Sequence, residues 1–98
     1  MNTEDKNLVL LEHLDEFRRW PYERLSAQIK AGILSSAGGV FPDGTEYQVE
    51  INVFWDGKPG GDIRVIGDLT TNPSLFLIGR PDVVSDFIKR PDGSFVGE

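Results

Sequence analysis

Apolar residues recur at three- and four-residue spacing over residues 3–19, which is typical of an amphipathic helix. Leu10, Leu14 and Phe17 share one stripe of this helix, and its opposite side carries mainly charged side chains. Pro21 ends the pattern, because the residue before a proline is disfavoured in the helical region. The sequence therefore predicts a first helix from Thr3 to Arg19.

A second, shorter helical pattern follows immediately. Pro21 suits the first position of a helix, where its missing N–H costs nothing. Tyr22, Leu25 and Ile29 then follow at helical spacing, and Gly32 is a suitable residue to end the helix. The small residues 35–39 carry neither helical nor strand periodicity, and we expect a flexible connection there.

From residue 45 to residue 56 apolar and polar residues alternate, as they do in a half-buried strand. The glycine-rich residues 56–61 predict a turn, and residues 62–69 form the returning strand. A hairpin symmetric about this loop pairs three sets of residues: Trp55 with Ile63, Val53 with Val65, and Ile51 with Gly67. Gly67 would leave a gap in which a helix could approach the sheet closely.

The C-terminal part is less regular. The apolar residues 75–78 fit either a buried strand or a collapsed loop. Residues 86–89 and 94–96 resemble the two sides of a second hairpin around residues 90–93. Helices followed by strands predict an α+β fold, with two N-terminal helices packed on an antiparallel β-sheet of three to five strands built from hairpins. We expect residues 1–98 to form a single domain.

Composition and charge exclude several classes of function. The 98 residues carry ten Lys and Arg against sixteen Asp and Glu, a formal charge of −6, with one His and no Cys. The absence of cysteine excludes disulfides and thiolate chemistry. The acidic balance argues against nucleic acid and anionic membranes as partners, since both require clustered cations. The polar start and short apolar runs predict a cytoplasmic protein without a membrane span.

Two segments carry a resemblance. Residues 53–65, which include FWDGKPGGDIRV, and residues 91–98, PDGSFVGE, resemble small uncharacterised bacterial proteins. The similarity covers roughly the C-terminal half of the chain and rests on turn and strand residues. It implies a bacterial cytosolic single domain, and it supplies no activity and no site residue.

Candidate catalytic chemistry is sparse. His13 and Glu16 have the spacing of a metal-binding pair, but His13 falls within the apolar arc of its helix. This favours a histidine at the core margin that is bonded through one nitrogen. The loop 57–61 has glycines but joins two strands, so a turn explains it better than a phosphate cradle. The sequence predicts no catalytic, metal-binding or cofactor-binding residue.

Phe54 and Ile66 are anomalous because both fall on the otherwise polar face of the hairpin. Two arrangements explain them. Either the C-terminal segment around Phe76 or Phe95 covers that face, or the pair forms an exposed apolar spot rimmed by Glu50, Arg64 and Asp68. Residues 41–68 also hold six acids against two bases, so most of the net charge is concentrated there.

These features favour a small acidic, non-enzymatic protein-binding module, similar to immunity or antitoxin proteins, that uses the face of the hairpin 45–69. Its partner would be a basic or mixed-charge protein. The candidate interface residues are Glu46, Glu50, Phe54, Arg64, Ile66 and Asp68. Two alternatives stay open: a structural homo-oligomer such as a homodimer, and a small-ligand binder or enzyme with a site near His13, Trp20 and Tyr22.

Overall fold

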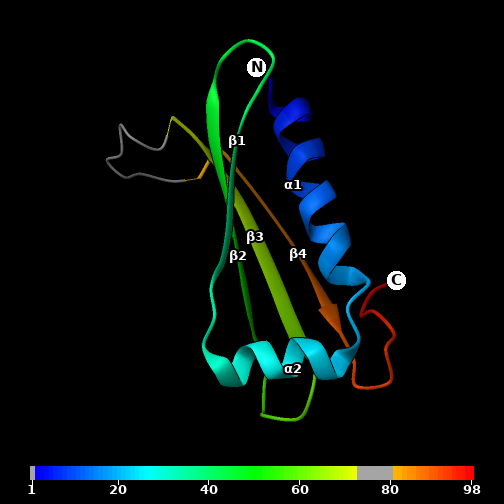
Figure 1. The fold of residues 1–98 in the computed structure, drawn as a ribbon. Coiled ribbons are helices and arrows are strands. Elements are labelled where there is room, and N and C mark those ends of the chain that lie inside the picture. Colours follow the sequence, from blue (N-terminus) through cyan, green and yellow to red (C-terminus); the bar gives the residue numbers. More distant parts are fainter. Residues whose placement is uncertain (1, 73–80) are drawn as a thin grey trace.

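The structure, a computed structural model, describes residues 2–72 and 81–98. Two helices and a four-stranded antiparallel sheet follow one another along the chain (Figure 1). Their bounds are α1 Thr3–Arg18, α2 Tyr22–Ala31, β1 Ser35–Val40, β2 Glu46–Trp55, β3 Ile63–Thr71 and β4 Val83–Lys89. The strands lie in the order β1-β2-β3-β4, so each strand pairs with its sequence neighbour. The predicted α+β fold is confirmed.

Both helices begin and end close to the predicted positions. The side chain of Asn2 caps α1 by accepting a hydrogen bond of 2.8 Å from the backbone N–H of Asp5. Pro21 is the residue just before α2 rather than its first residue. Gly32 ends α2 with a φ of 68°, a left-handed conformation that glycine adopts without strain.

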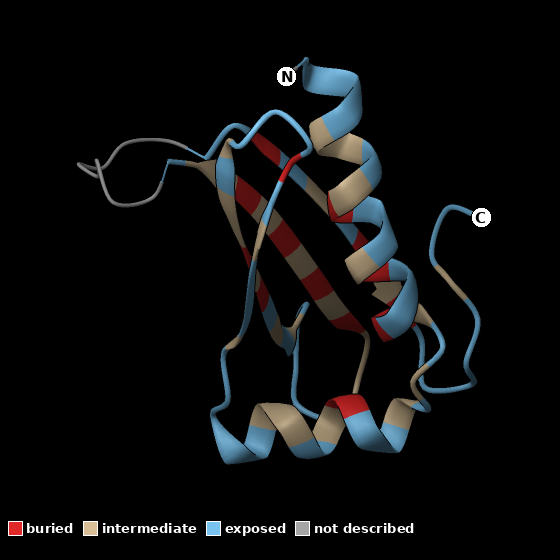
Figure 2. Ribbon diagram, turned by 45° about the horizontal axis from the view of Figure 1, so that its top comes forward, coloured by how far each residue is buried: buried red, intermediate tan, exposed pale blue. Residues whose placement is uncertain are grey.

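The β2–β3 hairpin has the predicted register: Trp55 opposite Ile63, Val53 opposite Val65, and Ile51 opposite Gly67. Along both strands the odd-numbered residues point to one face and supply much of the hydrophobic core (Figure 2). We call this the inner face, and the face of the even-numbered residues the outer face.

The expectation of a flexible connection over residues 35–39 was wrong. Residues 35–40 form β1, which pairs along β2 in continuous register from Ser35 opposite Ile51 to Val40 opposite Glu46. These small residues show no apolar alternation, so the strand arises from backbone pairing with β2. Gly39 is needed here, because a Cβ atom at this position would lie only 2.3 Å from the Tyr47 hydroxyl oxygen.

The helices pack on the inner face. α1 runs along β3 and β4, and α2 crosses one end of the sheet against β2 (Figure 1). α1 approaches the sheet closely at Gly67, as the sequence predicted: a Cβ atom there would lie 3.0 Å from Leu10 Cδ1 and 3.1 Å from Leu14 Cδ2. Neither helix has the length and hydrophobicity required to span a membrane, and none other is present in the described part of the chain.

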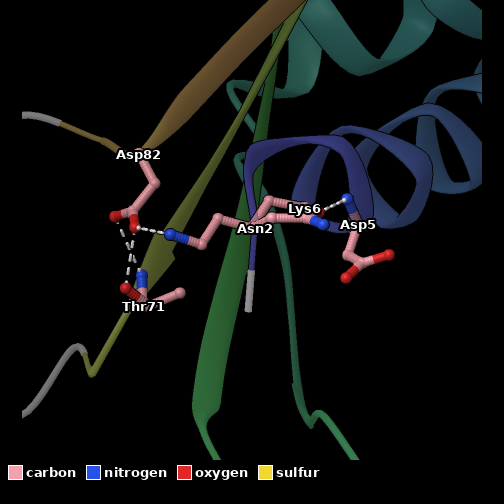
Figure 3. Close-up of polar contacts among 5 residues, drawn as sticks. All are labelled: Asn2, Asp5, Lys6, Thr71 and Asp82. Atoms are coloured by element: carbon pink, nitrogen blue, oxygen red, sulfur yellow. Dashed lines mark hydrogen bonds and ion pairs between the residues drawn. The ribbon is translucent and has the colours of Figure 1, made fainter.

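The N-terminal end of α1 is held by a polar cluster at the ends of β3 and β4. Lys6 Nζ lies 2.8 Å from Asp82 Oδ2, and the same carboxylate accepts hydrogen bonds from the backbone N–H and the hydroxyl of Thr71 (Figure 3). Partial burial disfavours the charged carboxylate, but the hydrogen bonds from Lys6 and Thr71 outweigh it and lower the pKa of Asp82.

The C-terminal end of α1 is held by β4. Lys89 is buried, and its Nζ donates to the backbone carbonyls of Arg18 and Trp20 over 3.1 and 2.7 Å. An ammonium group at this position satisfies carbonyls that the helix cannot pair and opposes the negative end of the helix dipole. The predicted second hairpin is present, but its returning side forms a single bridge, between Lys89 and Phe95. Residues 75–78 lie outside the described residues.

We expect Gly67→Ala to lower the free energy of unfolding by about 1–3 kcal/mol, because the added methyl group would press against Leu10 and Leu14. Urea denaturation followed by circular dichroism measures the change. Gly57→Ala is the matched control: its Cβ atom would meet nothing within 4 Å, so its effect should stay within about 0.5 kcal/mol. Equal losses in both variants would contradict the close approach of α1.

We expect Lys89→Met to lower the free energy of unfolding by about 1–3 kcal/mol, because the carbonyls of Arg18 and Trp20 lose their donor. The control is Lys30→Met, which removes an exposed lysine from the last turn of α2. The same denaturation experiment compares the two variants. A Lys89→Met protein as stable as Lys30→Met would show that these hydrogen bonds contribute little.

Candidate functional site

The outer face of the sheet carries the predicted interface. Both helices pack on the inner face, and among the described residues no helix or strand lies over the outer one. Three cross-strand rows traverse β2, β3 and β4 on this face: Phe54–Arg64–Ile88, Asn52–Ile66–Asp86 and Glu50–Asp68–Val84. The register therefore brings five of the six predicted residues onto one continuous surface.

Phe54 and Ile66 are diagonal neighbours on this surface, as predicted. Phe54 is 39% exposed and Ile66 is partly exposed. Phe95 does not cover them, because its ring packs 5.7 Å from that of Phe87 on the inner face. Phe76 lies outside the described residues. Of the two arrangements considered, the exposed apolar spot fits the described residues, and coverage by Phe95 was wrong.

Phe95 packs on the inner face, where it contacts Arg18 of α1. The guanidinium group of Arg18 lies 4.0 Å from the centre of the Phe95 ring, within range of a cation–π interaction. Arg18 also forms an ion pair with Glu98, and this hydrogen bond is the main reason that the pKa of Arg18 is raised. The C-terminal segment is thus bound beside the end of α1.

Arg64 lies in the outer-face row nearest the β2–β3 turn, between Phe54 on β2 and Ile88 on β4. Its Nε donates a hydrogen bond of 2.8 Å to Asp56 Oδ1, and its Nη1 donates to Asp86. The hydrogen bond with Asp56 is the largest cause of the raised pKa of Arg64. Since two acids share this one cation, this part of the face still carries a negative charge.

Glu50 and Asp68 lie directly opposite each other on β2 and β3. Like charges at such positions repel and destabilise a sheet. Partial burial, and then the charge of Glu50, raises the pKa of Asp68. Neither carboxylate forms an ion pair with any residue in the ranges 2–72 and 81–98. Within the described residues the pair is therefore a concentration of negative charge that no cation offsets, in the row next to Ile66 of the apolar spot.

Glu46 is on the same face but not in the same cluster. It begins β2, where it lies opposite Val40 of β1 and is exposed. At the rise of a β-strand, eight residues separate it from Phe54 by about 27 Å. Glu46 can extend the acidic surface, but it cannot act together with Phe54 on one small contact.

The prediction from sequence missed the residues that β4 contributes to the outer face. Val84, Asp86 and Ile88 complete the three rows, and Val84 is 58% exposed. The signal was present in the alternation along residues 83–89, where Val83, Phe87 and Lys89 are buried and their neighbours are not. The apolar spot is thus wider than the hairpin alone.

The alternative site near His13 is a cavity of about 210 Å³ between α1 and the first two strands. His13 and Trp20 line it together with Glu16, Ser35 and Ser36. Tyr22 does not: its hydroxyl donates to the carbonyl of Gly61, and its ring faces Trp55.

His13 is held as a core-margin residue. Its Nδ1 lies 2.9 Å from the carbonyl oxygen of Val9, which can only accept, so this nitrogen carries the hydrogen. No group of three or more potential metal ligands is found among residues 2–72 and 81–98. The cavity is also smaller than the usual pocket for a small molecule, about 300–1,000 Å³.

Comparison with known proteins returned no family model, no curated protein and no solved structure that matches this chain. The resemblance of residues 53–65 and 91–98 to small bacterial proteins stays a prediction. Function must therefore be inferred from the chemistry of the outer face itself.

The Glu50–Asp68 pair makes a prediction about pH. Because the pKa of Asp68 is raised in the folded state, its ionisation costs stability, and this cost appears as the pH rises through that pKa. We expect Asp68→Asn to be more stable than the natural protein by about 0.2–1 kcal/mol at neutral pH. The difference should vanish in acid, where Asp68 is protonated in both states.

Asp82→Asn is the matched comparison with the opposite sign. The pKa of Asp82 is lowered, so its stabilising contribution is present at neutral pH and is lost as the pH falls through the folded pKa. Thermal melts over a range of pH measure both variants. Destabilisation by Asp68→Asn at neutral pH would show that Glu50 and Asp68 do not repel.

Proposed function

We propose that this chain is a small acidic, non-enzymatic protein-binding module that uses the outer face of its sheet to bind a basic or mixed-charge protein. Immunity and antitoxin proteins, which neutralise a partner through an acidic surface, are the class of function that fits. The observation that carries the proposal is the Glu50–Asp68 pair, which no cation among the described residues offsets, on the same face as the exposed Phe54. A cytoplasmic, bacterial setting is part of the same proposal.

The charged part of the surface would set the partner's charge and the rate of encounter. A lysine or arginine of the partner placed between Glu50 and Asp68 would replace one repulsion by two attractions. Binding would thus remove the destabilisation that this repulsion causes in the free protein. A nearby negative surface also steers a cationic partner during diffusion. Arg64 is already occupied by Asp56 and Asp86 and does not weaken this effect.

The apolar part of the surface would supply most of the affinity. Phe54 and Ile66 are diagonal neighbours on β2 and β3, and Val84 and Ile88 continue the apolar surface onto β4. Large apolar side chains near the centre of an interface, surrounded by polar residues that exclude water, are where binding energy concentrates. Phe54 is the principal anchor because it combines an aromatic ring with exposure.

Affinity capture from an extract of the source organism at low salt, followed by binding measurements with the purified partner, tests the proposal. We expect the dissociation constant to rise with salt, because surface charges are screened. Glu50→Lys should weaken binding at least about tenfold, mainly through slower association. Phe54→Ala should weaken it by a similar factor through faster dissociation.

Matched controls lie on the exposed side of α1. Glu12→Lys makes the same change in charge, and Leu11→Ala removes a side chain that is 44% exposed. Both variants should bind as the natural protein does. A partner that binds equally well at high salt, or equally well to Glu50→Lys and Phe54→Ala, would show that the outer face is not the binding site.

A further inference from the structure

A second feature, separate from the outer face, is the free edge of the sheet. β1 is the first strand in the order and pairs only with β2 among the described strands. The backbone N–H of Phe41 bonds to Thr45, and that of Asn72 bonds to Glu46. Because hydrogen-bonded pairs alternate along an antiparallel ladder, Ser36, Gly38 and Val40 direct their N–H and C=O groups away from β2.

The opposite edge of the sheet, at β4, is partly covered by the chain itself. Along β4 the C-terminal segment returns, with the N–H of Val96 bonded to the carbonyl of Ile88 and a bridge between Lys89 and Phe95. Natural sheets usually protect edges in this way, or with lysine, proline or a bulge. β1 has none of these: no charged residue occurs from Ala31 to Pro42, and its register with β2 is unbroken.

The glycines of β1 give independent information. Gly39 is explained within one molecule, because the Tyr47 ring occupies the place of a side chain. Gly38 is not: its φ lies outside the left-handed region, and a Cβ atom would make only an ordinary contact of 3.6 Å with the carbonyl oxygen of Tyr47. A glycine within a strand that the strand itself does not need often marks the approach of another backbone.

We propose that β1 pairs with β1 of a second copy of this chain, forming a homodimer with a continuous eight-stranded antiparallel sheet. A two-fold pair centred on Ala37 places Ser36 of each copy opposite Gly38 of the other, so their outward N–H and C=O groups bond to each other. The same register brings Leu34 of each copy opposite Val40 of the other.

The exposed side chains agree with this register. Leu34 is 52% and Val40 is 63% exposed in the single chain, one at each end of β1. In the dimer they meet twice, because the two-fold axis repeats the contact. β1 is uncharged and its two ends complement each other, so a second copy of the chain fits it. A basic partner would find no carboxylate on β1.

The net charge makes the dimer distinguishable from the binding proposed for the outer face. Each copy carries −6, so two copies repel each other at long range, while the contacts along β1 are apolar and backbone bonds. Salt screens this repulsion. The dimer should therefore strengthen as salt increases, whereas binding of a basic protein to the outer face should weaken.

Sedimentation equilibrium at micromolar to millimolar concentration tests the dimer. We expect the mass of a dimer for the natural chain, with a dissociation constant that falls between about 0.05 M and 0.5 M salt. Gly38→Lys should raise this constant at least about tenfold, because two lysines would be placed beside the axis. Leu11→Lys, which adds the same charge to an exposed position on α1, should leave it unchanged.

Hydrogen exchange read residue by residue supplies a second measurement that does not depend on a variant's folding. The amides of Ser36, Gly38 and Val40 should become protected as the concentration rises, and those of Ala37 and Gly39, which face β2, should be protected throughout. A monomer at every concentration, a dimer that Gly38→Lys leaves intact, or one that Leu11→Lys dissociates would overturn the proposal. None of these results bears on the outer face.

Discussion

The close approach of α1 to β3 at Gly67 determines how the rest of the molecule is arranged. Because Gly67 has no side chain, Leu10 and Leu14 rest directly on the strand, and one long helix can cover the inner face of β3 and β4. Polar contacts at both ends then fix its direction: Lys6 with Asp82, and Lys89 with the carbonyls of Arg18 and Trp20 at the end of the helix. With both helices on this face, no helix of the described residues covers the outer face.

Local pattern predicted the helices, the β2–β3 register and the gap at Gly67, because alternation and turn chemistry act over a few residues. β1 could not be predicted in this way. Its small residues have no alternation, and its pairing comes from the backbone of β2. The position of Phe95 was also beyond local pattern, since it depends on Arg18, far away in sequence. At the candidate site, the sequence identified the acids and Phe54 but not the row contributed by β4.

The outer face and the edge of β1 are different surfaces with different chemistry, and their use is compatible. Residues opposite each other across a strand pair share a face of the sheet, so two copies joined through β1 would hold their outer faces on the same side. A partner with two basic patches could then contact both copies at once. Such a contact gains from effective concentration without any additional interaction.

The polar contacts at the two ends of α1 also connect residues that are far apart in the sequence. Lys6 and Asp82 are 76 residues apart, and Lys89 and Arg18 are 71 apart. A helix forms from neighbouring residues, whereas contacts of this separation require a long loop to close first. During synthesis α1 therefore emerges early but has no complete surface on which to rest until β4 follows it. Until β4 has been made, the apolar stripe of α1, Leu10, Leu14 and Phe17, lacks part of the surface against which it packs.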